Sequence, residues 1–383
     1  MHAAHSGQDM LGRLVAFDTT SRNSNLDLIA FAQELLQKAG ATTRLTYDSA
    51  KRKANVFATL GPAVDDGYVL SGHTDVVPVD GQDWSSDPFR ADVRDGLLYA
   101  RGAADMKGFI AVALALAPEF ANLSLKRPLH FALSFDEEVG CVGVRSLLAD
   151  LQAANIRPAL AIIGEPTEMR IVGAHKAGAV IETVATGRPA HSSAPAHGAS
   201  AVMMAGEFIG ALAALGNELM GDSDNHFDPP YTTVQANVFS GGTAVNVLAP
   251  EAKVTWEYRA LPDRNPDSVM ARAAAAAETI AARYRAGAPH AGFATAIKAA
   301  YPGLKRDFDS PAVRMACALS GSNDVHAVSY GTEAGLFQEA GIPSVICGPG
   351  SIEQGHKADE FVALDQLDAC AAFLRKVARK AAE

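Results

Sequence analysis

Two histidines and several carboxylates stand at the ends of short apolar or glycine-rich segments of this chain. They are His73 and Asp75 after Tyr68–Gly72, Asp105 before a helical pattern, Glu137 and Glu138 after Leu129–Phe135, Glu165 after Ala159–Gly164, and His356 after a glycine-rich segment. Imidazole and carboxylate groups together suit zinc, and also cobalt or manganese. Without cations, carboxylates packed closely would repel one another and take up protons. The set therefore predicts a hydrolytic site for two divalent ions, which such sites hold roughly 3.5–4 Å apart.

Glu137 and Glu138 are the most informative pair in this set. Neighbours on an extended strand point to opposite sides, but at a strand end, where the chain turns, both can reach one site in different roles. One carboxylate can then bind metal while the other stays free as a base. The alternative is a solvated acidic turn, and a purely structural metal site has no use for the second glutamate.

Each of these residues also has an ordinary explanation when it is taken alone. A histidine at a strand end is usually a core or loop residue, and Asp-Gly or Glu-Pro pairs usually mark turns. The set differs because its members fall at the same end of one predicted sheet. Open α/β sheets bind their ligands at that end.

Short apolar runs alternate with helical patterns in the first part of the chain. We expect buried strands at Asn55–Leu60, Tyr68–Ser71, Leu129–Phe135, Ala159–Ile163 and Ser344–Cys347, and helices at about Leu26–Lys38, Met106–Phe120 and Leu364–Ala381. Strands that alternate with helices indicate an α/β fold with a largely parallel sheet. We assign residues 1–177 and 300–383 to this domain.

The pattern changes in residues 178–299. Strands expected at Ala179–Thr186, Thr232–Phe239, Lys253–Arg259 and Phe293–Ala299 alternate with helices at Ala199–Leu215 and Pro266–Arg285. The order βαββαβ is typical of a ferredoxin-like domain. We predict that this second domain is inserted in the first.

Composition narrows the classes of partner and compartment. The 383 residues include 33 Lys and Arg against 43 Asp and Glu, a net charge of −10, which argues against nucleic acid and anionic membrane partners. Four separated cysteines form no CxxC pair, which argues against a thiolate zinc site and fits a reducing compartment. Residues 1–10 show no targeting segment, and apolar stretches such as Phe109–Leu116 are too short to cross a bilayer. We expect a soluble, cytoplasmic protein.

Several segments resemble those of the M20 metallopeptidase family, in the same order and over nearly the whole chain. They are Ser71–Pro78, Arg101–Gly108, Asp136–Glu138, Gly164–Thr167, Tyr330–Ala334 and Gly348–Glu360. The last two are most similar to the branch of the family that deacetylates N2-acetyl-L-ornithine. The resemblance implies a di-metal hydrolase domain with an inserted domain that serves as lid and dimerisation surface.

The resemblance also implies roles for individual residues. Asp105 would bridge the two ions. His73 and Glu165 would complete one metal site, and Glu138 and His356 the other. Glu137 would be the general base and acid, and Asp75 would lie behind His73 and fix its ring.

Further residues would contact the substrate if the resemblance extends to them. His191, in the segment Gly187–Ser193, would reach the active site of a neighbouring subunit and donate to the oxyanion, whereas the sequence alone favours a surface loop histidine. The candidates for substrate binding are Lys176, Asn246, Arg259, Gly331 and Thr332. An arginine can grip a substrate carboxylate through two hydrogen bonds, but Arg259 could equally be an ordinary strand-end residue.

The resemblance implies hydrolysis of N2-acetyl-L-ornithine to L-ornithine and acetate in arginine biosynthesis. The cofactor would be two divalent ions, zinc first, and the protein would be a homodimer that acts on a small N-acyl amino acid. Other readings within the family are a succinyl-diaminopimelate desuccinylase, another N-acyl-amino-acid deacylase or a dipeptidase. A metal-dependent binding protein without turnover is the alternative from another class.

Overall fold

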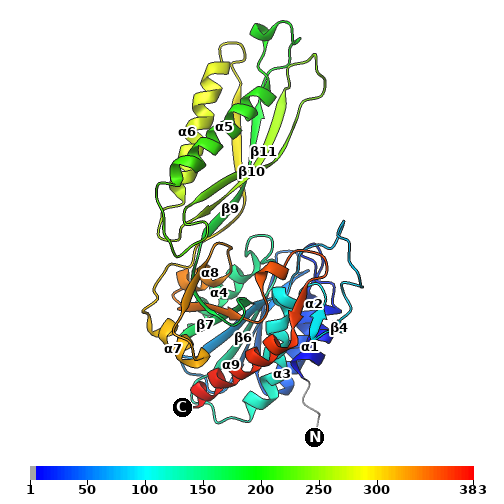
Figure 1. Ribbon diagram of the computed structural model, residues 1–383, viewed down its shortest axis with the longest axis vertical. Helices are drawn as coiled ribbons and strands as arrows, with labels where there is room; N and C mark the ends of the chain where they lie inside the picture. Colours follow the sequence, from blue (N-terminus) through cyan, green and yellow to red (C-terminus); the bar gives the residue numbers. More distant parts are fainter. Residues whose placement is uncertain (1–5) are drawn as a thin grey trace. The chain divides into compact units, whose positions relative to one another are not determined.

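The computed structural model describes residues 6–383, and these form two compact units (Figure 1). Unit 1 comprises the chain up to Ala174 together with Leu304–Ala327 and Thr332–Glu383, and unit 2 comprises His175–Gly303 and Val328–Gly331. The expected division was 178–299 for the inserted domain. The sequence did not predict the return of Val328–Gly331 to unit 2, where Val328 accepts a backbone hydrogen bond from Lys176 (3.3 Å). Residues 1–5, part of the segment without a targeting signal, lie outside the described residues.

Unit 1 is built on an eight-stranded mixed sheet with the order β1-β2-β6-β3-β7-β14-β8-β13. Its strands are β1 (Thr42–Tyr47), β2 (Ala54–Leu60), β3 (Tyr68–His73), β6 (Leu129–Ser134), β7 (Leu160–Pro166), β8 (Ile171–His175), β13 (Val325–Val328) and β14 (Ser344–Gly348). The central strands β6, β3, β7 and β14 run parallel, as expected for strands that are apolar on both faces. A small sheet pairs β15 (Phe361–Ala363), β5 (Leu97–Tyr99) and β4 (Asp92–Arg94).

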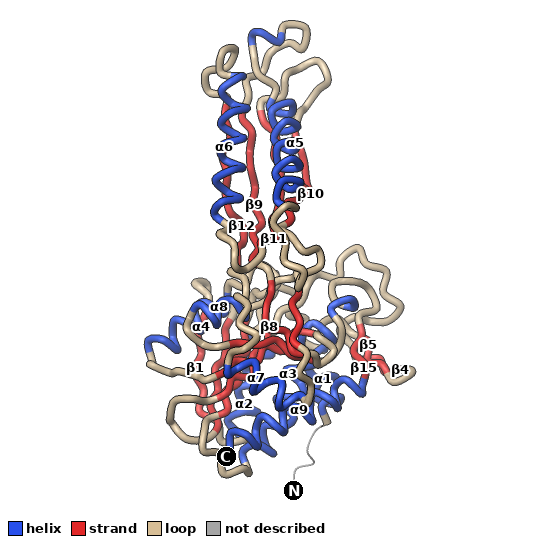
Figure 2. Tube along the Cα trace, turned by 60° about the vertical axis from the view of Figure 1, so that its left-hand side comes forward, coloured by secondary structure: helices blue, strands red, loops and turns tan. Residues whose placement is uncertain are grey.

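Helices cover both faces of the large sheet (Figure 2). On one face lie α1 (Gly7–Val15), α2 (Leu26–Lys38), α3 (Gly108–Ala121) and α9 (Leu364–Ala382), with α7 (Pro311–Ser320) against α9; on the other lie α4 (Gly143–Ala153) and α8 (Ala334–Glu339). This arrangement confirms the predicted α/β fold with a largely parallel sheet.

Unit 2 has a four-stranded antiparallel sheet with the order β10-β11-β9-β12. Its elements follow the predicted order: β9 (Ala177–Thr186), α5 (Ala201–Leu219), β10 (Thr233–Gly241), β11 (Glu251–Ala260), α6 (Asp267–Tyr284) and β12 (Gly292–Tyr301). Both helices pack on one face of the sheet, where Phe208 meets Trp256 edge to face at 6.2 Å. The expected ferredoxin-like domain is therefore present.

Helix α5 corrects one expectation from the sequence. Among residues 6–383 it is the one helix long and apolar enough to cross a membrane by length and composition. Glu207 and the glycines of this helix interrupt its apolar residues, so the segment did not stand out as a long apolar run. Its large residues Met204, Phe208, Leu212 and Leu215 are buried in unit 2. One face of helix α5 thus packs in the core of unit 2, while residues such as Met203 on the other face are exposed.

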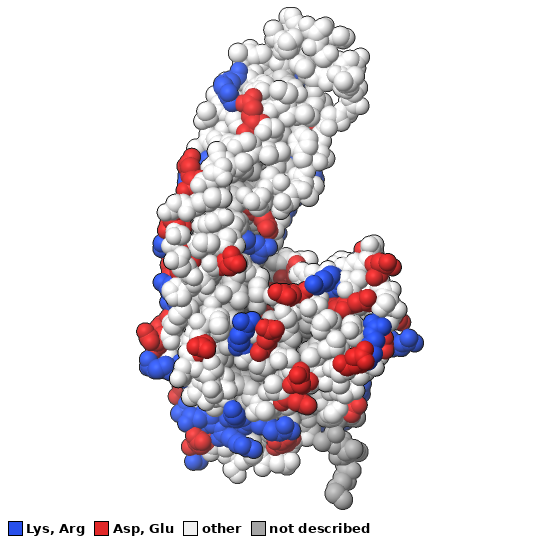
Figure 3. Space-filling view, in the orientation of Figure 1, with Lys and Arg blue, Asp and Glu red and all other residues white. Residues whose placement is uncertain are grey.

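The visible surface of unit 1 carries charged side chains of both signs, with Lys and Arg gathered at its lower left and Asp and Glu frequent toward the right (Figure 3). The excess of acidic residues in the sequence therefore does not form a field of one sign on this face.

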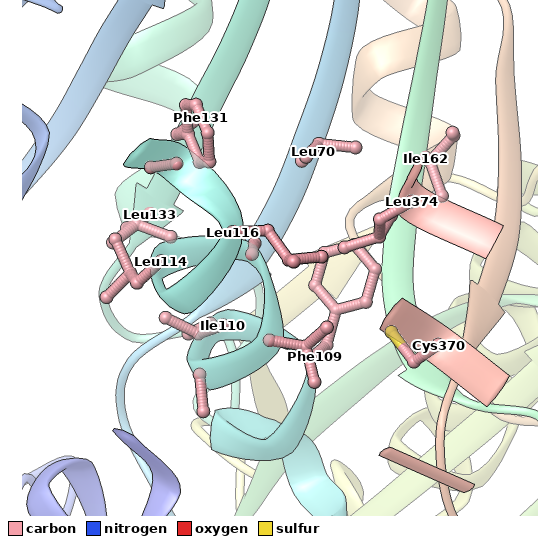
Figure 4. Close-up of a cluster of buried hydrophobic side chains, with 14 of the residues drawn as sticks. Leu70, Phe109, Ile110, Leu114, Leu116, Phe131, Leu133, Ile162, Cys370 and Leu374 are labelled. Atoms are coloured by element: carbon pink, nitrogen blue, oxygen red, sulfur yellow. The ribbon is translucent and has the colours of Figure 1, made fainter. Parts of the chain in front are cut away.

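The core of unit 1 brings α3 against the metal-site strands (Figure 4). Helix α3 is apolar on all sides, so it is buried between the sheet and α9. Phe109 lies so near β7 that a Cβ at Gly164 would stand 2.0 Å from its ring. Only glycine fits there, directly before Glu165.

Candidate metal centre

The predicted metal ligands lie at the carboxyl ends of the parallel strands of unit 1. His73 is the last residue of β3, Glu165 is near the end of β7, and Glu137 and Glu138 follow β6. Asp105 belongs to the irregular turn Ala103–Lys107, which leads into α3, and His356 follows β14. Because β3, β6, β7 and β14 run parallel, these ends share one edge of the sheet.

Asp105 stands between the two histidines. Its Oδ1 lies 3.0 Å from His73 Nε2, and its Oδ2 lies 3.2 Å from His356 Nε2. Glu165 lies 3.7 Å from His73 Nε2, and Glu138 lies 3.1 Å from His356 Nε2. Each carboxylate oxygen of Asp105 thus faces its own histidine, and each histidine also lies near a glutamate, as a bridging arrangement requires.

Glu137 stays close to this arrangement. Its carboxylate, His73 and Glu165 offer ligand atoms within 4.8 Å of one another, as do His73, Asp105 and Glu138. The structure therefore brings together all five predicted ligands and the predicted base, with His73, Asp105 and Glu165 buried.

Asp75 lies behind His73, but its main chain and its carboxylate have different partners, which the sequence did not predict. Its main-chain oxygen accepts a hydrogen bond from His73 Nδ1 (2.9 Å), while its carboxylate is 3.7 Å from that nitrogen. Because a carbonyl oxygen can only accept, Nδ1 carries a proton, and Nε2, which faces Asp105, is the nitrogen that can bind a cation. The Asp75 carboxylate instead accepts from the backbone N–H groups of Glu137 (3.1 Å) and Glu138 (3.3 Å).

His191 and Asn246 lie together in unit 2. His191 pairs with Val247 across an isolated bridge, and Asn246 accepts a hydrogen bond from the Ser192 backbone (3.0 Å). The His191 side chain is exposed, and its Nδ1 is 2.7 Å from Ser193 Oγ. We call His191 and Asn246 the loop pair.

Lys176, Arg259 and Gly331 form a second group in unit 2. Arg259 contacts the Tyr301 hydroxyl and donates to Glu257 (3.0 Å), and Gly331 lies against the Tyr301 ring. Lys176 Nζ donates to the carbonyls of Pro229 and Tyr231, both at 2.7 Å. We call these three residues the strand group. Thr332 belongs to unit 1, where its hydroxyl accepts from the Ala334 backbone (3.0 Å).

Comparison with known proteins assigns this chain to a protein family. Residues 69–380 match peptidase family M20/M25/M40. The chain belongs to this family. The resemblance inferred from the sequence motifs is thereby confirmed.

Relatives of this M20 chain are similar over nearly its whole length. It is 37% identical over 372 residues to an acetylornithine deacetylase of Myxococcus xanthus, covering 96% of this chain and 95% of the relative. It is 33% identical over 383 residues to an acetylornithine deacetylase of Pasteurella multocida, covering 96% of each. An identity of 37% over 96% of the chain is by itself enough to show membership of the family.

Solved M20 structures share the fold at lower sequence identity. The metallo-carboxypeptidase Sso-CP2 of Sulfolobus solfataricus superposes with a TM-score of 0.79 at 16% identity, covering 99% of both chains. The YXEP protein of Bacillus subtilis, described as a dinuclear metal-binding peptidase of the M20 family, has a TM-score of 0.66 at 18% identity and 97% coverage of both. These likenesses concern the fold alone.

The electrostatics of this M20 site fit divalent cations. Burial raises the pKa of Glu138 to about 7, and the charge of Asp105 adds to that rise. Burial likewise raises the pKa of Glu137 and of Glu165 well above the usual range. Hydrogen bonds to Asp105 and Glu138 raise the pKa of His356 to about 11. Without cations the site therefore holds protons, and bound metal would displace them.

Two further residues of the M20 site were not singled out from the sequence. Glu333 is buried at the start of α8, and its carboxylate accepts a hydrogen bond from Ser134 Oγ (2.6 Å). Burial raises the pKa of Glu333 to about 7. The thiol of Cys141 donates to Glu137 Oε1 at 3.4 Å. A sequence motif predicts neither contact. Glu333 and Ser134 are 199 positions apart, and a single cysteine belongs to no recognisable pattern of spacing.

Proposed function

We propose that this chain is a zinc-dependent amidohydrolase that cleaves N2-acetyl-L-ornithine to L-ornithine and acetate, in the cytoplasm and in arginine biosynthesis. The observation that carries the proposal is the paired geometry of Asp105, whose two oxygens each face a histidine beside a spare glutamate, Glu137. The names of the relatives from Myxococcus xanthus and Pasteurella multocida support the choice of substrate.

The residues of the site divide the chemistry among them. His73 and Glu165 would hold one ion, Glu138 and His356 the other, and Asp105 both. Zinc is the first choice for this donor set, with cobalt or manganese as alternatives. When bound, such ions lower the pKa of water and polarise a carbonyl group.

Glu137 performs the proton transfers of the reaction. Its carboxylate takes a proton from the water that attacks the acetyl carbonyl, and returns it to the nitrogen as the C–N bond breaks. The products are acetate and the free amine of ornithine. Asp75 holds the Glu137 backbone, and the Cys141 thiol contacts its carboxylate, so the base has a fixed orientation.

The two groups in unit 2 support a shared site in a homodimer. The loop that carries Asn246 enters β11 at Glu251, and Arg259 lies eight positions further along that strand. At about 3.3 Å per residue, Glu251, where that loop ends, and Arg259 are about 26 Å apart. One acetylated amino acid cannot span that distance.

We therefore assign the strand group to one active site and the loop pair to that of the partner subunit. In this arrangement His191 donates to the oxyanion of the partner's substrate. Arg259 releases its hydrogen bond to Glu257 and binds the substrate carboxylate instead. Lys176 and the Gly331–Thr332 backbone shape the pocket. Unit 2 would then serve as lid and dimerisation domain, with no nucleic acid or membrane partner.

The test is release of free amine from a small panel of substrates. N2-acetyl-L-ornithine, N-acetyl-L-citrulline, N-succinyl-diaminopimelate, N-acetyl-L-methionine and a dipeptide are each incubated with zinc or cobalt, and again after chelation. We expect metal-dependent turnover with acetylornithine fastest. A different leading substrate would overturn the substrate assignment, and binding of two ions without any turnover would favour a binding protein.

A further inference from the structure

A buried carboxylate next to the metal centre makes all its hydrogen bonds to one short segment. Glu360 Oε1 accepts from the backbone N–H groups of Ala104 (2.9 Å) and Asp105 (3.0 Å). Its Oε2 accepts from the Gly102 backbone (3.0 Å) and from Arg101 Nη1 (2.6 Å). Glu360 is 1% exposed, so these four donors replace water. The carboxylate thereby fixes the turn that presents Asp105.

Arg101 extends this contact to the segment that carries the second histidine. Its guanidinium is 1% exposed and donates through Nη2 to Gln82 Oε1 (2.5 Å). Gln82 Nε2 in turn donates to the main-chain oxygen of His356 (2.8 Å). Arg101 also lies over the Trp84 ring, 5.1 Å from its centre. One connected network therefore holds the backbone at Asp105 and at His356.

The site depends on this connection because its two ligands come from distant parts of the chain. Asp105 and His356 are separated by about 250 positions, and the two side chains meet at 3.2 Å. Asp105 itself lies in an irregular turn, with φ −117° and ψ 91°, so no regular helix fixes its direction. Outer contacts of this kind orient metal ligands in general.

We propose that Glu360 and Arg101 are the positioning residues of the metal centre, acting through the Asp105 turn and, by way of Gln82, through the His356 backbone. The inference rests on the proposed function, because it takes Asp105 and His356 to be metal ligands. Neither Glu360 nor Arg101 contacts the substrate. Their effect is on how strongly the ions are held.

Two substitutions test the role. Glu360→Gln keeps the size of the side chain, but it replaces one acceptor oxygen by an amide NH₂ that faces N–H donors. Arg101→Lys keeps the charge and loses the fork that joins Glu360 to Gln82. The matched control is Glu119→Gln, which removes the carboxylate of an exposed ion pair with Arg375 in the same unit (2.9 Å). Arg101→Lys is the second variant if Glu360→Gln fails to fold.

The measurement is zinc binding by competition with a chelator, together with the visible spectrum of the cobalt-loaded protein. We expect Glu360→Gln and Arg101→Lys to bind zinc about 10–100-fold more weakly. Their cobalt spectra should change, and added zinc should restore part of the lost kcat. Glu119→Gln should behave as the wild type.

Unchanged zinc affinity and an unchanged cobalt spectrum in both folded variants would overturn the inference, even if the melting temperature fell, because the pair would then only stabilise the fold. Zinc binding does not use the substrate. A wild-type chain that binds two ions but fails to hydrolyse acetylornithine would therefore reject the proposed function and leave this inference to its own test.

Discussion

Two ion-pair clusters, one in each unit, lie in contrasting environments. In unit 1, Arg101 and Glu360 form an ion pair that is 1% exposed on both sides, next to the carboxylates of the metal centre. In unit 2, Glu182 receives Lys253 and Lys298 on the open face of the sheet, both at 2.9 Å, with lysine side chains about half exposed. Buried charges must be compensated, whereas exposed pairs are screened by water. Substitutions of the buried charges of unit 1 should therefore have large effects, and substitutions of the exposed pairs of unit 2 small effects.

The largest effect in unit 1 is expected from removal of the bridging carboxylate. Asp105→Asn should lower kcat at least ~10⁴-fold, because both ions lose a shared anionic ligand. Zinc content and amine release measure the effect, with Asp92→Asn on β4 as control. Two firmly bound ions in Asp105→Asn would contradict the bridging role.

Replacement of the base should separate chemistry from metal binding. Glu137→Gln is expected to lower kcat by ~10²–10⁴, because proton transfer is lost while the five ligands remain. The measurement is turnover together with zinc stoichiometry. Retained activity would exclude Glu137 as the general base.

The loop pair is the exception expected in unit 2. His191→Ala should lower kcat by ~10²–10³, the usual loss for one oxyanion donor. Mixing His191→Ala with Glu137→Gln subunits should raise activity well above that of either variant alone, because one site of each heterodimer keeps both residues. Verified heterodimers without activity would show that the site is not shared.

A buried histidine of unit 1 should make stability depend on pH. Burial lowers the pKa of His130 to about 4, so below pH 6.5 the unfolded chain binds a proton that the folded chain does not. The contribution of His130 to the free energy of unfolding is therefore fully present above pH 6.5 and is lost as the pH falls towards 4. Between pH 7 and pH 5 this loss is about 2 kcal/mol.

Urea unfolding of the metal-free protein at both pH values measures this loss. His130→Gln should show a smaller loss between the two pH values than the wild type. The exposed His226 of unit 2 provides the control, His226→Gln. An identical pH dependence in His130→Gln and the wild type would count against the assignment.

The smallest effect is expected on the open face of unit 2. Glu182→Gln removes the partner of Lys253 and Lys298, yet it should move the melting temperature by about 2 °C or less, because solvent screens these pairs. High salt should remove even that difference. A larger shift would break the contrast between the units.

The sequence predicted what local patterns encode. Continuous apolar runs gave the buried strands β3, β6, β7 and β14, and the strand-end rule brought together the residues around Asp105. The amphipathic helix α1, the edge strand β1 and the three-stranded sheet were not predicted, because they are short or only half buried.

Sequence patterns could not predict the hydrogen-bond network of Glu360, Arg101 and Gln82. Glu360 reaches the Asp105 turn from about 255 positions away, and Gln82 reaches His356 from 274. No local periodicity encodes such contacts. The separation of the loop pair from the strand group follows from the extended strand β11 between them.

The short segment Val328–Gly331 limits how this protein can be recombined. It belongs to unit 2 although it follows Leu304–Ala327 of unit 1, and Ser329 donates to the Asp228 carbonyl (2.6 Å). A chimaera that exchanged only His175–Gly303 would separate these partners. Modular exchange between relatives must therefore carry two pieces of sequence at once, which favours inheritance of the two units as one block.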